Sequence, residues 1–165
     1  MKIRVVILFI FLLVAQNGHS QNKPTVDSIE VVKNLIRKTK SIESLYVGST
    51  VQTSKQCLRF LFLLKRLNLE ELITMSNDSS SCLRIYAYAS LLYRKYKNAG
   101  EIRLSQEKDT THLFYIRGCI GGTLKVPYIL ERVRLWNKKK EIAHWMKLYD
   151  EFESMWLKYL LTTKK

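Results

Sequence analysis

The residues with the clearest potential for chemistry surround Cys119, in the sequence Arg-Gly-Cys-Ile-Gly-Gly. A cysteine becomes a nucleophile when a nearby cation or histidine lowers the pKa of its thiol, and Arg117 and His112 precede Cys119 closely. The flanking glycines would leave backbone N–H groups open to an oxyanion. No third residue is evident to orient His112, and a cysteine beside Ile120 is also typical of a packed position. Cys119 and His112 are therefore weak candidates for a thiol-dependent enzyme, and we expect a chain without catalytic activity.

Motifs of other catalytic classes are absent from the sequence. It contains no Walker loop, no G-x-G-x-x-G, no H-E-x-x-H, no G-x-S-x-G and no C-x-x-C. Beyond the first twenty residues the histidines are His112 and His144, too few for a zinc site unless distant cysteines or carboxylates converge on them. We therefore expect no metal and no cofactor.

Positive charge is the strongest feature of the composition. The chain has 28 Lys and Arg against 14 Asp and Glu, which gives a formal net charge of +14. Basic clusters with tyrosine and tryptophan between them suit phosphate-rich or otherwise anionic partners. The alternative is that these cations only solvate helix faces and ends. The predicted anion-binding residues are Arg94, Lys95, Lys97, Arg132, Arg134, Lys138, Lys139 and Lys140.

The N-terminus indicates which anions are relevant. Two basic residues precede an apolar run over 5–15, and the small residues Gly18 and Ser20 follow it, as in a secretory signal peptide. The run is too short to span a bilayer of roughly 30 Å as a helix. We expect residues 1–20 to be cleaved and 21–165 to form one secreted or periplasmic domain without a transmembrane span. Lipopolysaccharide, anionic lipid, acidic glycan or an unknown protein is then a better expected partner than nucleic acid.

Export would place the three cysteines in an oxidising compartment. Because Cys57, Cys82 and Cys119 are odd in number, at most one bridge can form within the chain. Cys57 and Cys82 both fall on predicted helices that are able to pack antiparallel, so they form a candidate disulfide. The alternative is that all three are buried thiols that pack as small hydrophobic residues.

The apolar spacing predicts a mainly helical chain. We expect helices over 27–40, 53–67, 68–75 and 80–96, with loops at 41–52 and 101–112. The segment 112–133 has two interpretations. It is either a short hairpin with Gly121-Gly122 near its turn, within 111–130, or a loop that leads into a helix beginning at Pro127.

A long C-terminal amphipathic helix is expected to begin at Asn137. Apolar residues recur along it at alternating spacings of three and four, as in a heptad seam. This seam packs either on its own domain or on a partner helix, which leaves a monomer or a homodimer. The seam residues are Ile142, Trp145, Tyr149, Phe152, Trp156 and Tyr159.

The stretch 67–92 resembles a HEAT-type helical repeat. Leucines on a first helix are followed by the turn Asn77-Asp78 and then by Leu83-Arg84-x-x-Ala87-x-x-x-Leu91. The resemblance implies a close helix pair in which Arg84 pairs with the carboxylate of Asp78. A solenoid needs about three repeats, and only one copy is evident.

The expected fold is thus a small helical domain with one HEAT-like helix pair. The wider pattern also resembles small secreted bacterial proteins of unknown function, which implies export and brings no activity. The expected function is an exported, non-catalytic binding or structural module. The alternatives are a basic surface that binds envelope anions and an enzyme that uses Cys119.

Overall fold

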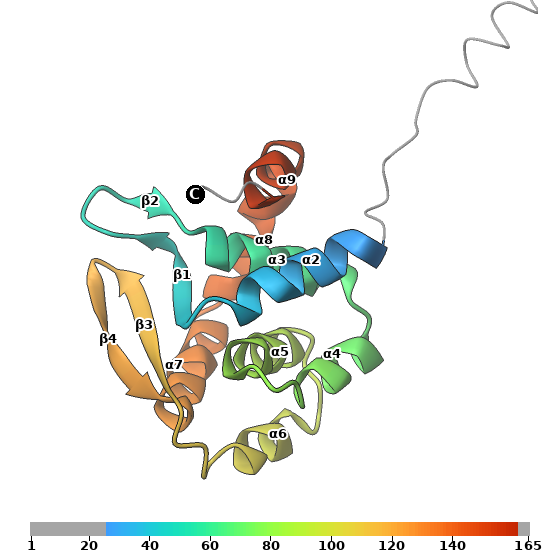
Figure 1. Cartoon of the computed structure of the whole chain (residues 1–165), viewed down its shortest axis with the longest axis vertical. Coiled ribbons are helices and arrows are strands. Elements are labelled where there is room, and N and C mark those ends of the chain that lie inside the picture. Colours follow the sequence, from blue (N-terminus) through green and yellow to red (C-terminus); the bar gives the residue numbers. More distant parts are fainter. Residues whose placement is uncertain (1–25, 162–165) are drawn as a thin grey trace, which may run out of the picture.

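The computed structural model describes residues 26–161 of the chain. Within this range eight helices pack beside a mixed sheet of four strands in the order β2-β1-β3-β4 (Figure 1). Helices predominate, as predicted, but the sheet is larger than the expected hairpin. The predicted signal peptide, residues 1–20, lies outside the described residues. No helix within 26–161 is long and apolar enough to cross a membrane.

The first part of the described chain comprises α2 (Val26–Arg37), β1 (Ser41–Val47), β2 (Gln52–Thr53) and α3 (Lys55–Arg66). The expectation of a loop over 41–52 is wrong, because β1 pairs in parallel with β3 and antiparallel with β2. Helix α3 begins at Ser54, whose side chain accepts a hydrogen bond from the backbone N–H of Cys57. Eight of its twelve residues are buried, so α3 is central to the core.

Three helices follow in the middle of the chain: α4 (Leu69–Met75), α5 (Ser81–Tyr93) and α6 (Ala99–Ser105). Asn68 and Glu71 form a reciprocal capping box at the start of α4, because each side chain accepts from the other residue's backbone N–H. Helix α6 occupies part of the segment that was expected to be a loop.

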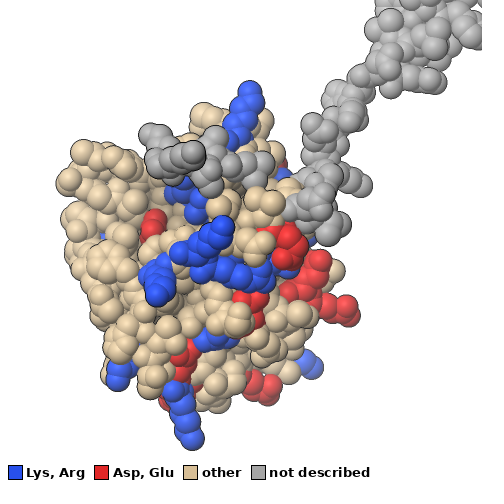
Figure 2. Space-filling view, viewed as in Figure 1, with Lys and Arg blue, Asp and Glu red and all other residues tan. Residues whose placement is uncertain are grey.

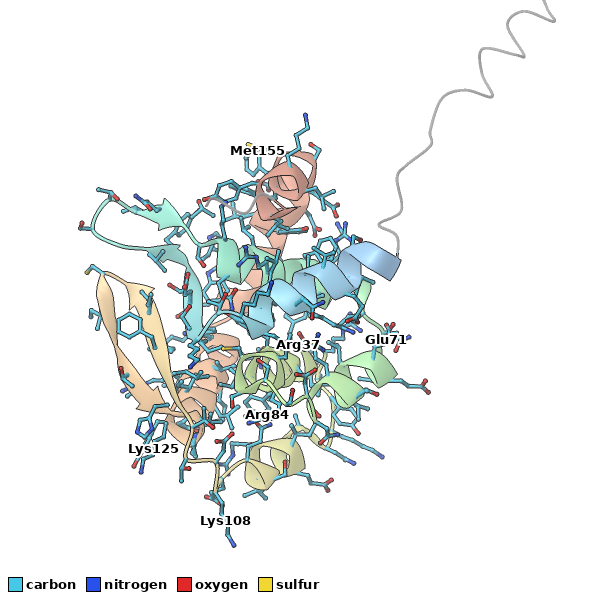
Figure 3. The ribbon with its side chains drawn as sticks, viewed as in Figure 1. Arg37, Glu71, Arg84, Lys108, Lys125 and Met155 are labelled. Carbon is cyan, nitrogen blue, oxygen red and sulfur yellow. The ribbon has the colours of Figure 1, made fainter. Side chains whose placement is uncertain are left out.

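The connection between α4 and α5 differs in its ion pairs from the resemblance to a HEAT repeat. The carboxylate of Asp78 pairs with Arg37 at 2.7 Å. Arg84 instead pairs with Asp109 and donates to the backbone oxygen of Asp78 at 2.8 Å. Figure 3 shows Arg37 and Arg84, from α2 and α5, on either side of this region. The connection is therefore held by residues distant in sequence, rather than within the helix pair alone.

A hairpin is formed by β3 (His112–Gly118) and β4 (Ile120–Lys125). Its turn lies at Gly118 and Cys119, and not near Gly121-Gly122 as expected. Gly118 has a φ of +59°, a conformation that glycine adopts without steric cost. Gly121 and Gly122 lie in β4, and the ring of Phe114 occupies the space beside Gly121, about 3.1 Å from where a Cβ would stand.

The C-terminal part forms α7 (Val126–Lys138), α8 (Glu141–Glu151) and α9 (Glu153–Leu161). Pro127 lies in the first turn of α7, which confirms the helix predicted there. The expected single helix from Asn137 onward is wrong. Asn137 lies in the last turn of α7, Lys140 has a left-handed φ of 58°, and the backbone breaks again at Phe152.

The core is centred on α3 and α5. The rings of Phe60 and Tyr86 stack with centroids 4.9 Å apart, and neither residue is exposed. Helix α5 also packs against α4 and α7, and α7 in turn packs against β3 and β4. One face of the hairpin is thus fixed to the helical core, whereas its turn extends beyond it.

Candidate ligand cleft between the hairpin and α7

The inner face of the hairpin and one side of α7 enclose a cleft of about 420 Å³. Strand alternation puts every second residue of β3 and β4 on this face, so Tyr115 and Arg117 lie opposite Gly122 and Ile120. The residues that line the cleft are Tyr115, Arg117, Ile120, Gly121, Gly122, Leu124, Arg132 and Leu135.

The direction of α7 explains why its residues reach the cleft. The helix begins directly after β4, and the backbone N–H of Val126 donates to the oxygen of Thr111 at 3.1 Å. The chain then returns along the hairpin toward its turn. Arg132 and Leu135 face the strands, whereas Ile129 and Val133 are fully buried against the core.

Tyr115, in the wall of the cleft, belongs to an aromatic cluster whose two tryptophans are buried behind it. The rings of Tyr115 and Trp136 stack at 5.8 Å, and the indole N–H of Trp136 donates to the hydroxyl of Tyr115 at 3.0 Å. Trp145 meets Trp136 edge-on at 5.0 Å. Burial raises the pKa of Tyr115, although the hydrogen bond from Trp136 and the nearby arginines oppose this shift, so the phenol stays neutral at ordinary pH.

The two arginines of the cleft have different surroundings. Arg117 pairs with Glu141, the first residue of α8, at 2.5 Å. Arg132 has no ion-pair or hydrogen-bond partner among residues 26–161. An unpaired guanidinium at the rim of an apolar cleft is suited to a carboxylate or a phosphate, because it offers two parallel donors.

The other predicted anion-binding residues are distributed over separate places. Arg134 is held by Glu131 one helical turn away, with contacts of 2.5 to 3.1 Å. Arg94 donates to the backbone oxygen of Leu64 at 2.5 Å, and Lys95 and Lys97 are exposed.

Lys138, Lys139 and Lys140 are exposed at the junction of α7 and α8, which the pair between Arg117 and Glu141 places beside the hairpin turn. The far end of α8 approaches α3, because Asp150 pairs with Lys65, the neighbour of Leu64. The 94–97 and 138–140 clusters therefore lie toward opposite ends of α8, and they do not form one surface.

The structure does not assemble the predicted thiol site. His112 begins β3 and Cys119 follows its last residue, so the two lie about 23 Å apart at the usual rise of a strand. Arg117 is engaged by Glu141. Cys119 is exposed, but neither of its expected partners is placed to activate it.

Cys57 and Cys82 are free, buried thiols, so the candidate disulfide is not formed in the structure. The sulfur of Cys82 is directed at backbone oxygens instead, 3.1 Å from that of Thr39 and 3.7 Å from that of Ser41. Burial raises the pKa of Cys57 and raises that of Cys82 to about 11. Within 26–161, no group of His, Cys, Asp and Glu is arranged to hold a metal ion.

The predicted partner-helix seam is divided by the break at Phe152. Ile142, Trp145 and Tyr149 on α8 are buried in the protein's own core. Phe152 and Tyr159 are 47% and 39% exposed, and Trp156 is half-buried. The first half of the seam, on α8, therefore packs within the protein itself. The second half, on α9, is short and partly buried, and it offers no continuous apolar stripe to a partner helix.

Sequence reasoning identified Arg132 but missed the other residues of the cleft. The alternation of Leu113, Tyr115 and Arg117 was a signal for one strand face, but it did not reveal which helix covers that face. Comparison of the chain with protein-family models, with curated protein sequences and with solved structures found no match.

Proposed function

We propose that this protein is an exported, non-catalytic binding module whose hairpin–α7 cleft binds a small amphipathic anion. The observation that carries the proposal is the unpaired guanidinium of Arg132 at the rim of an apolar cleft. Export by removal of residues 1–20 is part of the proposal, as is a HEAT-like structural role for the pair α4 and α5. The partner is then an anion of the cell envelope or its surroundings.

The cleft suits a ligand with an apolar body and one anionic group. Its volume of about 420 Å³ lies within the range of small-molecule sites, roughly 300–1,000 Å³. Leu124, Leu135 and the ring of Tyr115 offer apolar contact, and Gly122, opposite Tyr115, leaves room for the ligand close to the strand backbone. Arg132 fixes the anionic end, so the ligand would lie along the hairpin.

The experiment compares two arginines of the same helix. Octanoate, octyl phosphate and the uncharged octanol are titrated into the mature protein by calorimetry. We expect the two anions to bind and octanol to bind at least tenfold more weakly, because its neutral hydroxyl cannot form a charge-assisted, bidentate pair with the guanidinium. Arg132→Gln should weaken anion binding about tenfold or more, the usual effect of losing a charge-assisted hydrogen bond.

Arg134→Gln is the matched control, because Arg134 already pairs with Glu131 and does not line the cleft. This variant should change the affinity less than about twofold, as expected for a surface ion pair. Equal binding of octanol and octanoate, or equal loss in the two arginine variants, would contradict the proposal. Absence of binding by all three compounds would contradict it as well.

A further inference from the structure

We propose that the two turns at one end of the sheet dock the protein on an anionic membrane surface. Each turn presents one strongly exposed aliphatic side chain: Val51 between β1 and β2 is 67% exposed, and Ile120 beside the turn of β3 and β4 is 76% exposed. The backbone N–H of Gly48 donates to the oxygen of Gly118 at 3.0 Å, which ties the turns together. Figure 1 shows them side by side at the upper left.

Val51 is poorly matched to its place in the fold. Its φ is 51°, in the left-handed region that glycine and asparagine adopt readily and that a β-branched residue rarely adopts. Its side chain is also mostly in water, so it adds little burial to the core. A β-branched apolar residue with a left-handed backbone and an exposed side chain does not stabilise the fold. Its presence therefore indicates a functional role.

The charges around the two turns favour an anionic surface. The segments 44–53 and 118–124 contain no charged residue, and Figure 2 shows few charged side chains on the sheet side, at the left of the view. Arg117 and the exposed Lys138, Lys139 and Lys140 lie at the junction beside the hairpin turn. Glu141, the carboxylate at this junction, is already neutralised by Arg117.

Apolar turns flanked by lysines match a lipid surface better than other anions. Stable attachment to a membrane generally needs two signals, and here aliphatic side chains would enter the headgroup region while lysines attract anionic lipid. A free phosphate or a glycan would use the lysines alone and leave Val51 without a role. A second copy of this chain would itself carry a strong net positive charge and would be repelled by these lysines.

The experiment uses Cys119 as a reporter, because it is the exposed one of the three cysteines and lies in the turn. An environment-sensitive nitrobenzoxadiazole label on Cys119 is mixed with phosphatidylcholine vesicles, with and without phosphatidylglycerol. We expect a blue-shifted, stronger emission with the anionic vesicles, and little change with neutral vesicles or inorganic phosphate. High salt should reduce the response.

The decisive variant is Val51→Asn, because asparagine tolerates the left-handed backbone and the protein should fold at least as stably. We expect its partition onto anionic vesicles to fall about tenfold, from the loss of the apolar side chain. Tyr128→Asn is the control, since Tyr128 is 65% exposed but lies in the first turn of α7. This turn follows Lys125, which Figure 3 shows at the base of the hairpin, far from the two turns.

Three results would overturn the inference: no change of emission with anionic vesicles, equal partition of Val51→Asn and the unchanged chain, or equal loss in Tyr128→Asn. Val51 does not line the cleft, so vesicle binding and octanoate binding are separate readouts. A protein that binds octanoate but not vesicles would retain the cleft proposal and lose this one, and the reverse result would do the opposite.

Discussion

The outer backbone edges of β1 and β4 differ in how their hydrogen-bonding groups are covered. Along β1, the backbone N–H of Glu43 donates to the hydroxyl of Tyr86 at 3.3 Å, and Gln56 donates to the oxygen of Ser41 at 3.4 Å. The inner edge of β4 pairs with β3. Its outer edge receives no comparable hydrogen bond from residues 26–161. The side of β1 that faces away from β3 is therefore covered by α3, α5 and the short strand β2, whereas the outer edge of β4 is left open.

The two sides of the molecule also differ in whether their reactive side chains are buried or accessible. On the helical side, Cys57, Cys82 and Tyr86 are buried, and burial raises the pKa of each, so they remain neutral. On the hairpin side, Arg132, Cys119 and the lysines at 138–140 stay accessible. The sequence alone does not separate these groups, because the same residue types occur in both.

Thiol reactivity should separate the two sides most strongly. In the folded protein a maleimide should label Cys119 more than about a hundredfold faster than Cys82, because each pKa unit lowers the thiolate fraction tenfold and burial also blocks access. Mass spectrometry of peptides from native and urea-unfolded protein measures both rates. Fast labelling of Cys57 or Cys82 in the native protein would contradict the burial of these thiols in the helical core.

Truncation of side chains should distinguish the sides next. Phe60→Ala should lower the free energy of unfolding by about 3–5 kcal/mol, because it removes a fully buried ring that stacks on Tyr86. Ile120→Ala, on the exposed turn, should change it by less than about 0.5 kcal/mol. Urea denaturation of both variants measures the contrast, and similar losses would contradict it.

The covered edge of β1 gives the smallest of these effects. Tyr86→Phe should lower the free energy of unfolding by about 1–3 kcal/mol, because the backbone N–H of the half-buried Glu43 loses its acceptor while the ring still packs. The control is Tyr46→Phe, which removes a hydroxyl from a tyrosine that is 43% exposed on the same strand. If the two variants have equal stability in urea, Tyr86 does not cover this edge.

Local signals predicted the helices α2 to α5, but they did not predict α6, the division of the C-terminal helix or the sheet. The start of α4 at Asn68 and the first turn of α7 at Pro127 depend on neighbours in sequence. The first agrees with the helix expected over 68–75, and the second with one of the two interpretations of 112–133. Strand β1 lacks alternation, because Ser41 and Ser44 are buried and satisfied by hydrogen bonds to Glu43 and to the oxygen of Tyr46. Such burial depends on the rest of the molecule.

The candidate site shows the same limit. Arg132 belongs to a basic stretch that the sequence displays openly, but the cleft beside it exists only because the hairpin turns at Gly118 and α7 folds back along it. With the turn near Gly121-Gly122, as the sequence suggested, the pairing of β3 with β4 would change, and other residues of β4 would face the cleft. The long C-terminal helix was misjudged because its regular apolar spacing continues across the backbone break at Phe152.

The parallel pairing of β1 with β3 also has a consequence for the order of assembly. Ser41 pairs with Phe114 across all of α3 to α6, whereas the hairpin of β3 and β4 closes between neighbours in sequence. Closing so long a loop costs entropy before its contacts are gained, so the hairpin and the helices are expected to form early and the four-stranded sheet late. Gly48 and Gly118 then meet in one of the last steps, so the paired turns form only after the segments between them have folded.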